Sequence, residues 1–103
     1  MTINIDENQL ITQHGMTIPW EEIVAVHAAK YDLIERQLTI MTFEHVSGAF
    51  VEIAEDEDGF AALKAQLGNH LPLPANWFDR LTALTTSDAI TLFERNLDSP
   101  GSN

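Results

Sequence analysis

Apolar and polar residues alternate along much of the first half of the chain, a period typical of β-strands that bury one face. We predict strands over residues 2–5, 9–13, 23–29, 37–44 and 49–54. The segments Asp6-Glu7-Asn8 and His45-Val46-Ser47-Gly48 separate neighbouring strands and have the composition of turns, which predicts two hairpins. Strand 37–44 is apolar on both faces, which favours a central position in its sheet.

Between these strands the pattern is interrupted twice. Gly15 ends the second strand, and residues 18–22 form a bend because Pro19 cannot donate to a strand ladder. Residues 31–36 are predicted as a loop or a single helical turn.

The apolar period then changes from 2 to 3.6, which predicts a helix. Phe60, Leu63 and Leu67 fall on one face, and Gly68 or Asn69 ends the helix. We expect Asp56 or Glu55 to cap its first turn, with Glu57 and Asp58 complementing the positive end of the helix dipole.

A second short helix follows the stiff segment Leu71-Pro72-Leu73-Pro74. Asn76 is its predicted cap, with Asp79 in the reciprocal position, and Trp77, Leu81 and Leu84 form its buried stripe. A last strand is predicted over 88–94.

Strands that are segregated from helices indicate the α+β class. We predict one α+β domain over residues 1–95 and a flexible C-terminal tail over 96–103. Its core is a curved antiparallel sheet of about five or six strands, packed on one or two helices.

The net charge of the chain limits the classes of molecule that it is expected to bind. Five Lys/Arg against sixteen Asp/Glu give a net charge of −11. Such a surface repels nucleic-acid phosphates and anionic membranes, so neither is expected as a partner. A basic protein would instead be attracted.

The chain has no cysteine, which excludes disulfides, thiolate metal sites and a cysteine nucleophile. The N-terminal sequence lacks a basic stretch followed by an apolar run, and no window approaches the ~20 apolar residues of a membrane span. These features together predict a cytoplasmic protein.

One acidic segment stands out as candidate chemistry. Five of the seven residues from 52 to 58 are acidic, and Gly59 follows. Aligning Gly59 with the invariant glycine of a calcium loop puts Ala54 and Ala65 at ligand positions, so this is not an EF-hand. We interpret the segment as a candidate interaction surface together with a tryptophan whose location is ambiguous: Glu52, Glu55, Asp56, Glu57, Asp58 and Trp20.

No local motif predicts catalysis, a cofactor or a metal. His14, His27, His45 and His70 lack the close spacing that places ligands on one face of an element. The chain has no nucleophile elbow and no glycine-rich phosphate loop, so we expect a protein that is not an enzyme and binds no cofactor. His27 is interpreted as a half-buried, hydrogen-bonded side chain of its strand.

Two segments carry a family resemblance. Residues 18–26, IPWEEIVAV, resemble the entrance to a strand in bacterial pleckstrin-homology-like domains. Residues 52–63, EIAEDEDGFAAL, with the later Trp77, resemble a set of small bacterial proteins of uncharacterised function. The resemblance implies a curved antiparallel sheet packed on a helix and carries over no catalytic residue. The basic loop that reads phosphoinositides is missing, so lipid binding is not implied.

Three hypotheses for function follow. The first is a non-enzymatic protein-interaction module whose acidic surface binds a basic partner, for example a toxin, as some small acidic bacterial proteins do. The second is an enzyme or metal-binding protein whose site is assembled from scattered residues, among them His14, His27 and His45, with carboxylates. The third is a homodimer formed through the exposed edge of the first hairpin.

Overall fold

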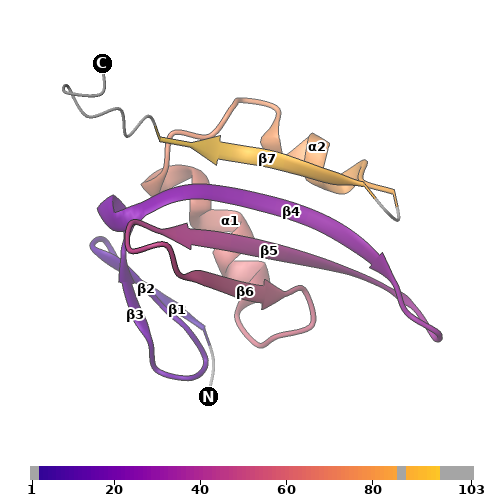
Figure 1. Ribbon diagram of the computed structural model, residues 1–103, viewed down its shortest axis with the longest axis horizontal. Coiled ribbons are helices and arrows are strands. Elements are labelled where there is room, and N and C mark those ends of the chain that lie inside the picture. The colour runs from indigo at the N-terminus through magenta and orange to yellow at the C-terminus, as the bar shows by residue number, and fades with distance from the viewer. Residues whose placement is uncertain (1–2, 86–87, 96–103) are drawn as a thin grey trace.

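The structure, a computed structural model, describes residues 3–85 and 88–95 (Figure 1). Along the chain the elements are β1 (Asn4–Ile5), β2 (Gln9–Ile11), β3 (Thr17–Pro19), the 3₁₀ turn η1 (Trp20–Glu22), β4 (Ile23–Asp32), β5 (Gln37–His45), β6 (Phe50–Ala54), α1 (Phe60–His70), α2 (Trp77–Thr82) and β7 (Ala89–Glu94). The predicted tail, 96–103, lies outside the described residues, as does the start of the first predicted strand.

The strands form two antiparallel sheets, which confirms the α+β class. One has the order β1-β2-β3 and the other the order β6-β5-β4-β7, and neither closes into a barrel. The single sheet of five or six strands is therefore replaced by sheets of three and four strands. As predicted, β5 is central in its sheet, and the last strand is present as β7.

The strand that the sequence did not predict is β3. It pairs with β2 through Leu10↔Ile18, and Pro19 lies opposite Gln9 at its end. Proline is tolerated there because β3 is an edge strand, so the missing N–H removes no ladder bond from a central position. Trp20, the next residue, donates its N–H to Asn8 O at 3.1 Å and extends the contact.

The core lies between the four-stranded sheet and α1, which runs behind β5 and β6 in Figure 1. Phe60, Leu63 and Leu67 are buried, as the helical spacing predicts. They belong to one cluster with the inward-facing residues Val26, Met41, Phe43 and Ile53, each at most 1% exposed.

Two β-bulges bend this sheet near one end. Val24 is the extra residue where β4 pairs with β5, and Leu92 is the extra residue where β7 pairs with β4. Both bulges place consecutive buried residues on one strand, which a regular alternation could not do.

At the other end, β4 and β5 continue past their neighbours as a two-stranded arm, residues 30–39 (Figure 1). Its turn is closed by Leu33 N–H to Arg36 O (2.7 Å) and Arg36 N–H to Leu33 O (3.3 Å). The predicted loop is present over residues 33–36 as a tight hairpin turn, with no helical turn, whereas residues 31 and 32 belong to β4. The molecule is 48 Å long against 29 and 25 Å in the other directions.

The helix boundaries also differ from the predicted ones. α1 continues through Gly68 to His70, and the chain becomes extended at Leu71. Gly68 lies inside the helix, and a Cβ there would lie 3.4 Å from Trp77 Nε1, close to an ordinary van der Waals contact. Asn76 precedes α2, but its side chain makes no capping hydrogen bond.

Across residues 3–85 and 88–95, no helix combines the length and apolar character needed to cross a membrane.

Candidate functional site

The acidic segment, residues 52–58, begins in β6 and ends just before α1, and hydrogen bonds hold its backbone in place. Glu57 N–H donates to Ala54 O at 3.0 Å, and Phe60 N–H donates to Glu57 O at 3.1 Å. Ile3 N–H donates to Asp58 O at 3.0 Å, which ties the step to the start of the three-stranded sheet. We call residues 52–58 the acidic step.

Three carboxylates of the acidic step have partners inside the molecule. Glu55 Oε1 accepts from Thr39 N–H at 2.8 Å, and Glu57 Oε2 accepts from Ala54 N–H at 2.9 Å. Asp56 forms an ion pair with Arg36 of the arm at 2.5 Å. These carboxylates therefore hold the step in shape.

The predicted cap of α1 by Asp56 or Glu55 is wrong, because both carboxylates bind other parts of the chain. The residue that precedes α1 is Gly59, with φ +93°, and no side chain caps the first turn. A Cβ at Gly59 would lie 2.6 Å from Ile3 O, so the close approach of the two backbones requires glycine. The carboxylates of Asp56 and Glu55 point to the arm and to β5 instead.

Glu52 and Asp58 are the two members of the step whose side chains are exposed and take part in no hydrogen bond or ion pair within the described residues. Because the backbone on which they stand is fixed, ordering them against a cation of a partner would cost side-chain entropy but little backbone entropy. They are the carboxylates best placed for an intermolecular contact.

Trp20 does not belong to this surface. Its side chain is 5% exposed and lies in the core cluster. The indole Nε1–H donates to Asp6 O at 2.9 Å, and the ring stacks on His70 with centroids 4.6 Å apart and planes within 2°. Its inclusion in the candidate surface is corrected: it anchors η1 to the first hairpin.

The histidines are used singly. His14 is exposed, and His27 is half-buried with Nδ1 3.0 Å from Thr91 Oγ1, as interpreted from the sequence. His27 Nε2 also lies 3.6 Å from Glu44 Oε1. Within residues 3–85 and 88–95, no group of three or more His, Asp or Glu is placed to hold a metal ion. The structure does not bring His14, His27 and His45 together with carboxylates as a metal cluster.

Sequence reasoning missed one polar chain, at the turn after β5. His45 Nε2 lies 2.7 Å from Glu22 Oε1, and His45 Nδ1 lies 2.8 Å from Ser47 Oγ. Ser47 N–H also donates to Nδ1 at 3.1 Å, which assigns the neutral ring an Nε2–H that points to Glu22. The two-residue spacing of His45 and Ser47 gave no catalytic signal, and Glu22 is 23 positions away.

This chain of contacts has the members of a hydrolytic triad but not the surrounding donors. The nearby backbone N–H groups of Val46, Gly48 and Ala49 are already bound to Glu22 O, His45 O and Ser47 Oγ. An oxyanion needs free, converging N–H groups. The arrangement therefore serves as a clamp between η1 and the β5–β6 turn.

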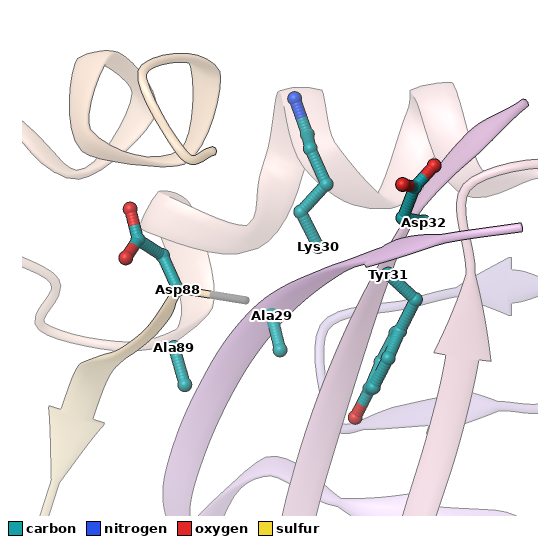
Figure 2. A pocket seen from close by; sticks show the side chains of 6 residues that line it. All are labelled: Ala29, Lys30, Tyr31, Asp32, Asp88 and Ala89. Atoms are coloured by element: carbon teal, nitrogen blue, oxygen red, sulfur yellow. The ribbon is translucent and has the colours of Figure 1, made fainter. Parts of the chain in front are cut away.

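The surface also has a hollow of about 420 Å³ at the root of the arm, next to Ala89, where β7 begins its pairing with β4 (Figure 2). Ala29, Tyr31 and Ala89 point to one side of it and Lys30 and Asp32 to the other (Figure 2). A second hollow of about 200 Å³ includes Lys30, Lys64 and Glu55. Neither contains a member of the His45 clamp.

No protein-family model matches the chain, and comparisons with curated proteins and with solved structures give no significant match.

Proposed function

We propose that this chain is a non-enzymatic protein-interaction module that presents the acidic step to a basic protein partner. The observation that carries the proposal is the pair of exposed carboxylates, Glu52 and Asp58, on a backbone that internal hydrogen bonds hold in place. The net charge of −11 adds long-range attraction for a cationic partner. A basic toxin fits this chemistry, and the absence of cysteine fits a reducing compartment such as the cytoplasm.

A pleckstrin-homology-like relationship is part of the same proposal. Seven antiparallel strands in two sheets, with a helix packed in the core, support it. The open sheets and the position of both helices before β7 depart from a complete barrel of that family. The proposal therefore borrows no lipid or peptide site from it.

The test begins with capture of partners from native lysate at low and then moderate salt, read by mass spectrometry. We expect a basic protein that is lost as salt rises, because exposed ion pairs are screened over about 10 Å at 0.1 M salt. The affinity of that protein for the chain is then measured with variants.

The decisive variant is Glu52→Lys/Asp58→Lys, because neither side chain has a partner in the described structure. Glu55 is left intact because it accepts from Thr39 N–H. The matched control is Glu7→Lys/Glu21→Lys, two exposed residues remote from the acidic step, which changes the net charge by the same amount.

We expect the first variant to weaken binding at least about tenfold more than the control, which is about 1.4 kcal/mol of binding free energy. Equal losses would show that only total charge matters and would reject the acidic step as the contact surface. Stoichiometric metal in protein purified without chelator would favour the metal-binding alternative.

A further inference from the structure

The arm is an unusual extension for so small a molecule. Beyond the rung Lys30↔Thr39, β4 and β5 pair only with each other. At that rung Lys30 N–H still reaches Asp88 O (3.3 Å), and Thr39 O still accepts from Glu55 N–H (2.9 Å). A two-stranded ribbon is marginal alone, and unpaired strand edges tend to find partners.

The end of the arm is apolar where it meets solvent. Ile34 at the turn is fully exposed, at 103%, and its neighbours Tyr31 and Leu33 are 47% and 43% exposed. None of these side chains belongs to the hydrophobic core cluster. Three large exposed hydrophobic residues within four positions are typical of a surface that another molecule covers.

A matching concave feature lies at the root of the same arm. The hollow of about 420 Å³ presents Ala29, Tyr31 and Ala89 on one side (Figure 2). The tip itself borders a shallow hollow of about 520 Å³, from which the fully exposed Ile34 projects. A projecting apolar side chain and a partly apolar hollow therefore lie on one ribbon, a few residues apart.

The charges identify the occupant. The formal charges of residues 30–39 cancel, Lys30 and Arg36 against Asp32 and Glu35, and the net −11 lies on the rest of the chain. Asp88, which also lines the hollow, adds one negative charge beside the arm. A strongly basic partner gains little at this nearly neutral surface, compared with the rest of the chain. A second copy of the chain, which most other surfaces would repel, can approach here with little like-charge repulsion.

We infer that two copies associate through their arms in an isologous, antiparallel arrangement. The Ile34 tip of each copy fills the hollow beside Ala29, Tyr31 and Ala89 of the other, as a two-fold axis at the middle of the arms requires. This interface does not rest on the proposed function, although Asp56 of the acidic step is paired with Arg36 near the tip of the arm. It also differs from the first hairpin, where the sequence suggested self-association.

The first test measures molar mass by light scattering and sedimentation over a range of concentrations. We expect a dimer of the 11.5 kDa chain that becomes stronger as salt rises, because salt screens repulsion between the two acidic bodies. A basic-partner complex weakens under the same change, so the two proposals fail independently. A monomer at all concentrations up to about 1 mM would overturn the inference.

Variants then locate the interface. Ile34→Asp should raise the dissociation constant at least about tenfold. Val46→Asp is the matched control, because Val46 is 54% exposed at the β5–β6 turn, and it should leave the constant unchanged. A larger loss with Val46→Asp would overturn the arrangement.

A cross-link tests the antiparallel geometry directly, because the chain has no cysteine of its own. A mixture of Glu35→Cys and Ala89→Cys proteins should form a disulfide-linked pair between tip and root, whereas Glu35→Cys alone should form few. Preferential linkage of two Glu35→Cys chains would reject the antiparallel form. If the wild type stays monomeric while Ile34→Asp abolishes capture of another protein, the arm binds a different partner and the second-copy inference is wrong.

Discussion

β4 and β5 pair with each other in two regions of the molecule, which differ in their flanking strands and in the burial of their side chains. We call the four-stranded sheet outside the arm, together with α1, the body. There the pair Val26↔Phe43 has β7 and β6 on its outer edges and shares one core cluster with α1, and both side chains are at most 1% exposed. In the arm, the pair Tyr31↔Leu38 continues the same ladder without a third strand, and Tyr31 is 47% exposed.

The comparison separates what the ladder contributes from what packing contributes. Interstrand hydrogen bonds exchange water for protein partners and contribute little each in net terms, whereas burial of large apolar side chains contributes about 1.5–3 kcal/mol each. The body should therefore determine the stability of the molecule, and the arm should be free to carry another role.

The largest expected effect tests this division. Phe43→Ala should lower the free energy of unfolding by about 3–5 kcal/mol, because it leaves a cavity against α1. Ile34→Ala in the arm should change it by less than about 0.5 kcal/mol. Urea unfolding at a concentration that keeps the chain monomeric measures both, and a comparable loss from the arm variant would break the comparison.

A smaller effect concerns how the body is closed at the start of α1. Gly59→Ala must place a Cβ at positive φ and 2.6 Å from Ile3 O, so we expect a loss of about 2–4 kcal/mol. Gly48 has nearly the same φ, +95°, but nothing within 4 Å of the added Cβ. Gly48→Ala should therefore lose only about 1–2 kcal/mol, and equal losses in thermal unfolding would show that the contact with Ile3 is unimportant.

The smallest effect lies at the border of the two regions. Glu55→Ala removes the carboxylate that accepts from Thr39 N–H, so the free energy of unfolding should fall by about 1 kcal/mol. Hydrogen exchange should show faster exchange at the Thr39 amide in the variant and no change at Phe43. Unchanged protection at Thr39 would mean that another group holds this amide.

The sequence predicted the parts of the molecule that a repeating period encodes. The spacing of Phe60, Leu63 and Leu67 located the buried face of α1, and the hairpin of β5 and β6 followed from alternation and its turn. These elements are long enough for a period to emerge.

The features that were missed depend on contacts between distant residues. β3 has only three residues and ends in proline, so it is too short to show the alternation of apolar and polar residues that predicts a strand. The carboxylates of the acidic step follow the composition of a helix cap, but Thr39 and Arg36, which hold two of them, lie on another part of the chain. Trp20 gave no signal of its burial because its partners are Asp6 and His70.

The strand order β6-β5-β4-β7 also has a consequence for how the chain reaches this structure. β4, β5 and β6 follow one another and can form as a local meander, as hairpins do within microseconds. β7 must instead reach β4 across a wide interval, with His27 and Thr91 64 positions apart. Long-range pairing of this kind slows folding. The edge of β4 that faces away from β5 therefore stays unpaired until β7 docks. Closing the long segment between β4 and β7 is the step that completes the four-stranded sheet.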